Sequence, residues 1–155
     1  MDYKLRIYLD TSVPSALFHG TQLKQDFTGD LFDNYLPSCN TFISEIVLAE
    51  IRATVEDELR EKLYMSVSDF TILPVTEKIE KICDEYLTYL TVPRNDALHI
   101  AIASVYGADY LLTWNMRHMA REKTMNIVDI VNLNHSLPAV FIINPQDFIG
   151  GERND

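Results

Sequence analysis

The sequence predicts a three-layer α/β/α sandwich in which a mainly parallel β-sheet lies between two layers of helices. Short β-rich segments alternate with longer amphipathic segments along the 155 residues, which is typical of parallel strands joined by helices. Polar residues, Asp10 and Asn115, directly follow two of the β-rich segments. Because ligands of such sheets bind beyond the carboxyl ends of the strands, these two positions are the first candidates for a functional site.

The N-terminal quarter begins with a strand. Residues 4–9 alternate between apolar and other side chains, and this period of two predicts a strand that ends at Asp10. Pro14 then suits the first turn of a helix, and residues 15–20 form a short helical segment that a glycine ends. Residues 21–34 mix polar and apolar types, so we expect a loop that leads into a helix.

The middle of the chain predicts two short strands and two helices. One strand closes at Ile43, and Ser44 then provides a helix N-cap. Apolar residues recur at helical spacing over residues 47–55. Residues 70–75, FTILPV, indicate a second short strand, and residues 76–90 form an amphipathic helix.

A buried helix is the strongest feature of the C-terminal third. We expect Asp96 to cap it, Tyr106 to end it and Gly107 to provide the stop after it. The remaining elements predicted here are a strand at ADYLLTW, one or two short helices in residues 116–137, and a last strand at AVFIIN. We assign residues 1–149 to one domain and residues 150–155 to a flexible C-terminal tail.

Composition limits the classes of function. The net charge of −10 argues against broad, non-specific adhesion to nucleic acid, which needs a basic surface. It is compatible with an enzyme whose acids bind divalent cations, and with a basic protein partner. The cysteines Cys39 and Cys83 share no CxxC spacing, which argues against a structural zinc site.

The N-terminal residues lack the apolar core of a signal peptide, and no apolar run approaches the roughly 18 residues of a membrane span. We therefore expect a cytoplasmic protein without a membrane partner. The sequence has neither a GxGxxG nor a GxxxxGK[ST] loop, which argues against dinucleotide or nucleoside-triphosphate binding.

Five polar residues are candidates for the site, and each taken alone has a simpler role. Asp10 and Asn115 could cap the segments that follow them, and Asp96 could cap the buried helix. Glu50 could be an exposed glutamate on a helix surface. His99 lies one helical turn after Asp96, and for it we favour a hydrogen-bonded histidine of the core.

Taken together, the acids have a recognisable order: a strand ending in Asp, a helix with Glu, a helix N-terminus with Asp, and a strand ending in Thr-x-Asn. In this order the chain resembles the PIN domain, the fold of VapC-type toxin ribonucleases. The similar stretches are YLDTSVPSALF, SEIVLAEI, DALHIAIASVYGADYLLTWNMRHM and, more loosely, FIINPQDFI. Asp10, Glu50 and Asp96 match the family's three central acids. Asn115 stands where many members have a fourth acid, although a subgroup with TWN followed by a basic residue and His is also similar.

The resemblance implies a Mg²⁺- or Mn²⁺-dependent endoribonuclease, the toxin of a type II toxin–antitoxin pair. Its expected partners are an RNA substrate, a cognate antitoxin and a second copy of the chain in a homodimer. We expect Asp10, Glu50 and Asp96 to hold the metal directly or through water, because hard cations prefer oxygen ligands. Asn115 is expected to be an outer ligand or to orient a water molecule. Behind these residues, hydrogen-bond donors to the site are expected at three positions: Thr11, Ser12 and Thr113.

Two other functions use the same residues. The first is a catalytically weakened PIN-like module, in which Asn115 has replaced a needed acid and the protein acts by binding protein or nucleic acid. The second is a phosphatase or small-molecule hydrolase with the same metal chemistry. A metal titration followed by thermal unfolding separates the first alternative from an enzyme, because a working site gains stability from Mn²⁺.

Overall fold

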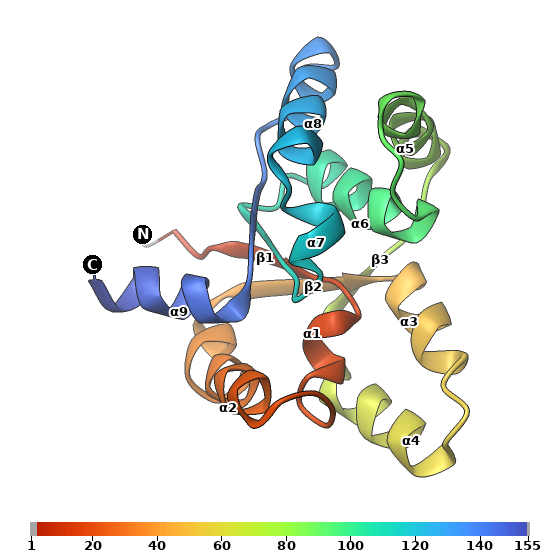
Figure 1. Cartoon of the computed structure of the whole chain (residues 1–155). Helices are drawn as coiled ribbons and strands as arrows, with labels where there is room; N and C mark the ends of the chain where they lie inside the picture. Colours follow the sequence, from red (N-terminus) through yellow and green to blue (C-terminus); the bar gives the residue numbers. More distant parts are fainter. Residues whose placement is uncertain (1–2, 155) are drawn as a thin grey trace.

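A sheet of five parallel strands forms the centre of the molecule within residues 3–154, the part of the chain that the computed structural model describes (Figure 1). The strands are β1 (Arg6–Leu9), β2 (Asn40–Ser44), β3 (Thr71–Leu73), β4 (Tyr110–Leu112) and β5 (Phe141–Ile143). Their order is β3-β2-β1-β4-β5, and every neighbouring pair is parallel. The chain thus builds one half of the sheet outward from β1 and then returns to β1 to build the other half. The boundary between β1 and β4 is the topological switch point, where such sheets bind their ligands.

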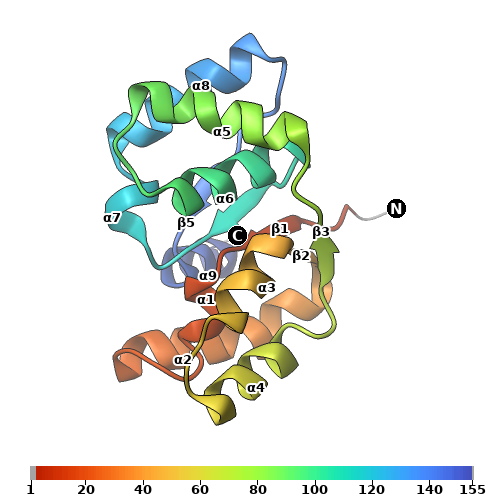
Figure 2. The ribbon, with the colours of Figure 1, turned by 90° about the vertical axis from the view of Figure 1, so that its right-hand side faces the viewer.

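Helices cover both faces of the sheet, as the predicted sandwich requires (Figures 1 and 2). One layer contains α5 (Glu77–Tyr89), α6 (Arg94–Val105), α7 (Met116–Met119) and α8 (Glu122–Asn134). The other contains α1 (Ser12–Ser15), α2 (Gln22–Asp30), α3 (Glu45–Arg52), α4 (Asp57–Ser66) and α9 (Pro145–Asn154). A separate apolar cluster lies on each face, because side chains of β1 alternate between them: Tyr8 joins the first cluster, and Ile7 and Leu9 join the second. None of the described helices has both the length and the apolar character that crossing a membrane requires.

The prediction of a loop at the start of residues 21–34 was wrong, because α2 already begins at Gln22. The Thr21 side chain caps the helix by accepting a hydrogen bond from the backbone N–H of Lys24. The helix continues into a π-helical turn, Leu31–Tyr35. Few apolar residues recur at helical spacing in α2, so periodicity gave no signal for it, whereas the Thr21 cap was a readable one.

Helix α6 passes through the middle of its layer, with residues 97–104 all buried. It begins at Arg94, directly after Pro93, and Asp96 therefore lies in its first turn. The prediction that Asp96 is the N-cap was wrong, because the N-cap is Pro93 and Asp96 lies three residues after it. An acid in the first turn still interacts favourably with the positive end of the helix dipole.

The last strand leads directly into α9, which begins with Pro145, a residue that suits a first helical position. The Asn144 side chain accepts a hydrogen bond from the backbone N–H of Asp147 at 2.7 Å, and the buried Phe148 and Ile149 anchor the helix in the second cluster. Helical backbone continues to Asn154, so the predicted start of a flexible tail at residue 150 falls inside this helix. Asp155 lies outside the described residues.

Candidate active site

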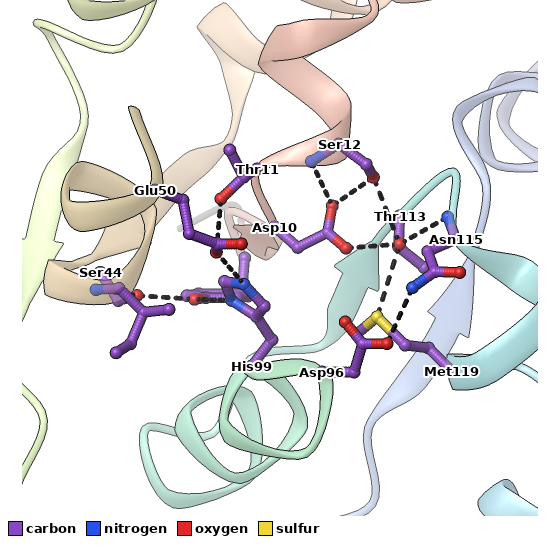
Figure 3. Close-up of polar contacts among 12 residues, drawn as sticks. Asp10, Thr11, Ser12, Ser44, Glu50, Asp96, His99, Thr113, Asn115 and Met119 are labelled. Carbon is purple, nitrogen blue, oxygen red and sulfur yellow. Dashed lines mark hydrogen bonds and ion pairs between the residues drawn. The ribbon is translucent and has the colours of Figure 1, made fainter. Parts of the chain in front are cut away.

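The predicted site residues meet at the carboxyl edge of the sheet, beside the switch point (Figure 3). Asp10 follows β1 and Asn115 follows β4, whereas Glu50 comes from α3 and Asp96 from α6. Asp10 occupies the centre of this group, with Glu50 on one side and Asp96 and Asn115 on the other (Figure 3). Residues that are distant in the sequence thus converge because the two halves of the sheet share β1.

Asp10 is 3% exposed, and hydrogen bonds hold both of its carboxylate oxygens. Its Oδ1 accepts from the backbone N–H of Ser12 at 3.1 Å and from the Ser12 hydroxyl at 2.5 Å, and its Oδ2 accepts from the Thr113 hydroxyl at 2.5 Å. Each of these hydroxyls also accepts a hydrogen bond from the backbone. The N–H of Trp114 donates to Ser12 Oγ, and the N–H of Asn115 donates to Thr113 Oγ1. The predicted donors Ser12 and Thr113 therefore fix Asp10 and join the end of β1 to the end of β4.

The surroundings of Asp10 raise the pKa of its carboxyl group. Burial is the largest cause, because it disfavours the charged form, and the nearby charge of Asp96 acts in the same direction. The charge of His99 and the hydrogen bonds from Ser12 and Thr113 act in the opposite direction without cancelling the effect. An ionised Asp10 is therefore costly in this site, and a bound cation would reduce that cost.

Glu50 is held by two donors on one oxygen. Its Oε1 accepts from the Thr11 hydroxyl at 2.9 Å and lies 2.8 Å from His99 Nε2. Partial burial raises the pKa of Glu50, but the hydrogen bond and charge of His99 and the bond from Thr11 outweigh it, so that the pKa is lowered overall. Glu50 is thus stabilised as a carboxylate, with its side chain 35% exposed at the rim of the site.

His99 is the site residue whose role the sequence did not reveal. It is 3% exposed, which fits the predicted core histidine, but its Nε2 faces Glu50 while its Nδ1 lies 2.7 Å from the Tyr8 hydroxyl. Tyr8 in turn contacts the Ser44 hydroxyl at 2.8 Å. An ionised Glu50 only accepts, so Nε2 must donate, and in a neutral ring Nδ1 then accepts from Tyr8. A buried chain of hydrogen bonds thus orients the ring that holds Glu50.

Asp96 is held from the opposite side of the site. Its Oδ2 accepts from the Asn115 amide nitrogen at 2.9 Å and lies 3.0 Å from His118 Nδ1. The His118 side chain is 40% exposed. Asn115 therefore supplies an uncharged donor to Asp96 at the position where a fourth acid would bring a second negative charge.

We expect Asn115→Asp to destabilise the metal-free protein by about 1 kcal/mol. The substitution removes the N–H that Asp96 accepts and places a like charge beside it. In EDTA, the variant should have a lower Tm than the wild type. Added Mn²⁺ should raise the Tm of the variant by more than it raises the Tm of the wild type. Asn126→Asp, at an exposed position of α8, is the matched control. Equal Tm values for the two variants in EDTA would contradict a direct contact between residues 115 and 96.

The donor set fits a hard divalent cation. Among residues 3–151, whose side chains the structure describes, the ion pairs of Glu50 and Asp96 go to histidines, and no Lys or Arg forms an ion pair with any of the three acids. Among the same residues, no group of three or more His, Cys, Asp and Glu side chains is arranged to hold a metal ion. Each carboxylate is hydrogen-bonded to different partners, so we expect a cation held by these acids to keep part of its water shell, as Mg²⁺ usually does.

Comparison with known proteins agrees with this architecture. The chain superimposes on a VapBC2 structure from Rickettsia felis bound to a promoter DNA fragment, with a TM-score of 0.58 and 21% identity over 89% of this chain and 97% of that chain. Mycobacterium tuberculosis VapC20, described as a Sarcin-Ricin loop cleaving toxin, gives a TM-score of 0.60 and 17% identity over 74% of this chain and 93% of that chain. A toxin–antitoxin complex from Klebsiella pneumoniae gives a TM-score of 0.60 and 19% identity over 76% of this chain and 93% of that chain. At these identities the likeness shows a shared fold.

Sequence comparison identifies the family. No curated protein sequence matches the chain significantly. The sequence profile of the PIN domain, in contrast, matches residues 7–121, a range that contains Asp10, Glu50, Asp96 and Asn115. This match spans well over half of the chain, and the fold and the position of the acids agree with it. The chain belongs to the PIN domain family.

Proposed function

We propose that this PIN domain is a Mg²⁺- or Mn²⁺-dependent endoribonuclease and the toxin of a type II toxin–antitoxin pair. The observation that carries the proposal is the buried Asp10 carboxylate at the switch point, flanked by Glu50 and Asp96, with no Lys or Arg ion pair among the described residues to compensate these charges. Burial disfavours the negative charge of Asp10, and a bound cation would compensate for this cost.

The three acids would share one task in phosphodiester hydrolysis. Asp10, Glu50 and Asp96 would hold the cation, directly or through water. When bound, a divalent cation polarises the scissile phosphate and helps to ionise an attacking water molecule. The supporting residues keep the carboxylate oxygens oriented: Ser12 and Thr113 for Asp10, Thr11 and His99 for Glu50, and Asn115 for Asp96.

Water is the attacking group that this arrangement favours. The hydroxyls of Thr11, Ser12 and Thr113 all donate to carboxylates that we assign to the cation, so we infer that none of them is the attacking nucleophile. A reaction that needs no covalent intermediate fits this use of the hydroxyls.

The proposed partners are supported by the same relatives. One of them is described as cleaving the Sarcin-Ricin loop, which supports an RNA substrate, and two others are toxin–antitoxin assemblies, which supports an antitoxin. The net charge of −10 suits a partner that brings basic side chains to the acidic site. A homodimer is proposed by analogy with the family.

Mn²⁺ titration tests the metal site independently of catalysis. At a hundredfold excess over its Kd, Mn²⁺ should stabilise the wild type by about 2.7 kcal/mol, which corresponds to a rise in Tm of roughly 5–10 °C. The same titration of Asp10→Asn should give less than half of this rise. Equal shifts in the two proteins would show that Mn²⁺ binds elsewhere.

A second candidate function, binding without catalysis, is favoured by one observation: among the described residues, no three His, Cys, Asp or Glu side chains are grouped closely enough to hold a metal ion. The absence of a Tm shift with either Mg²⁺ or Mn²⁺, together with intact RNA after incubation, would support this second function against the first. A Tm shift together with RNA cleavage that EDTA stops would exclude it.

A further inference from the structure

An open groove of about 320 Å³ lies beside the acids, between α1, the start of α2 and the residues that follow β4. Its basic side chains are His19 and Lys24, and its aromatic side chain is Trp114. Among the described residues that line it there is no Asp or Glu, although the whole chain carries a charge of −10. The groove is therefore suited to an anion with an apolar or aromatic part.

The groove is continuous with the candidate active site, because two residues belong to both. Ser12 lines the groove and donates its hydroxyl to Asp10, and Asn115 lines the groove and donates its amide N–H to Asp96. A phosphodiester chain whose scissile phosphate lies at the acids would therefore place a neighbouring nucleotide in the groove.

Trp114 is held in position before any ligand binds. Its indole Nε1–H donates to the hydroxyl of the buried Thr28 at 3.0 Å, and its backbone N–H donates to Ser12 Oγ at 2.9 Å. The Lys24 ammonium lies 5.5 Å from the centre of the indole ring, close enough for a cation–π interaction. An aromatic ring that is held in place thus lies under a cation, and proteins combine aromatic rings with cations to bind single-stranded nucleic acid.

We propose that this groove binds the nucleotide adjacent to the scissile phosphate of a single-stranded RNA. Lys24 and His19 contact its phosphate, and Trp114 contacts its base. The inference rests on the proposed ribonuclease function, and it assigns residues outside the acidic site to substrate binding. A single strand is favoured over a protein partner because the lining pairs the Lys24 cation with an aromatic ring next to the proposed phosphodiester-cleaving site.

Trp114 is the only tryptophan of the chain, so its fluorescence reports on this groove alone. We would titrate Asp10→Asn, which keeps the RNA intact, with a single-stranded RNA of about ten nucleotides, a length within the usual site sizes of such proteins. The expected result is saturable quenching of Trp114 fluorescence. In the same background, Lys24→Ala should weaken binding several-fold and make the salt dependence shallower by about 0.7, the slope of one phosphate contact. Lys78→Ala, which removes an exposed lysine of α5, should bind like its parent.

Binding of the same RNA carrying a fluorescent label separates contact from structural support. Trp114→Leu should weaken binding by roughly five- to a hundredfold, the range measured for loss of one stacked base. Trp114→Phe keeps an aromatic ring but loses the bond to Thr28, and it should recover most of the affinity. Equal losses in the two variants would assign Trp114 a structural role and overturn the proposal.

The outcomes distinguish this inference from the proposed function. Quenching by RNA with no cleavage by the wild type would support the groove and contradict the nuclease. Cleavage by the wild type with no change in Trp114 fluorescence, or with unchanged RNA affinity in Lys24→Ala, would overturn the groove and leave the nuclease. Quenching by an acidic peptide but not by RNA would identify a protein-binding groove and would also overturn the proposal.

Discussion

Asp10→Asn is expected to reduce RNA cleavage by at least about a thousandfold, the equivalent of roughly 4 kcal/mol of transition-state stabilisation. The substitution removes the central negative charge of the site and keeps the shape of the side chain. The fold should survive, because the amide oxygen can still accept from Ser12 and the amide N–H can donate to the Thr113 hydroxyl, which is able to accept.

The measurement is the initial rate of cleavage of a labelled RNA with saturating Mn²⁺, compared at equal concentrations of folded protein. Asp129→Asn, which neutralises an exposed acid of α8, is the matched control and should cleave at the wild-type rate. A folded Asp10→Asn protein that cleaves RNA as fast as the wild type would remove Asp10 from the catalytic site.

Asp10→Asn should also change how the stability of the fold depends on pH. A carboxyl whose pKa is raised in the folded protein destabilises the fold above that pKa and has no effect below its ordinary pKa, where both states are protonated. In EDTA, Asp10→Asn should therefore have a higher Tm than the wild type at neutral pH, and the difference should narrow as the pH falls toward the ordinary pKa of aspartate. A difference that is constant with pH would show that burial of the charge is not its cause.

His99→Leu is expected to have the second-largest effect. The substitution removes the hydrogen-bond donor to Glu50 and the hydrogen-bond partner of the Tyr8 hydroxyl. Both contacts are made by a side chain that is only 3% exposed. Unmade buried hydrogen bonds cost about 1–3 kcal/mol, so urea unfolding should show a loss of that size. Because Glu50 then loses its orientation, the apparent affinity for Mn²⁺ or the cleavage rate should fall by about 10- to 100-fold, as is typical when a supporting partner of a metal ligand is removed.

His99→Gln separates positioning of Glu50 from support of the core. Its side-chain N–H can reach toward Glu50, so this variant should recover part of the Mn²⁺ affinity that His99→Leu loses. If the two variants lose the same affinity, or if His99→Leu cleaves RNA at the wild-type rate per folded molecule, then His99 serves only the core.

The sequence was a good guide to those features that depend on local patterns. Alternation along residues 4–9 predicted β1, and the polar residues after two strands predicted that Asp10 and Asn115 would share an edge of the sheet, which the strand order confirms. What could not be read locally were contacts between distant elements. His99 meets Glu50 across 49 positions of the chain and Tyr8 across 91, so helical spacing could relate His99 only to Asp96.

The strand order also has a consequence for biosynthesis. The shortest bridge across the switch point joins Asp10 to Thr113, 103 positions later, and Trp114 reaches back to Ser12 over a similar interval. Closing such long loops is slow in folding and requires that both ends of the loop exist. A ribosome that has made only the first two thirds of this chain has therefore not yet made Thr113, Trp114 or Asn115, and the site cannot be completed without them. If the proposed function holds, the growing chain cannot cleave RNA until translation is nearly finished, and an antitoxin can be made before that point.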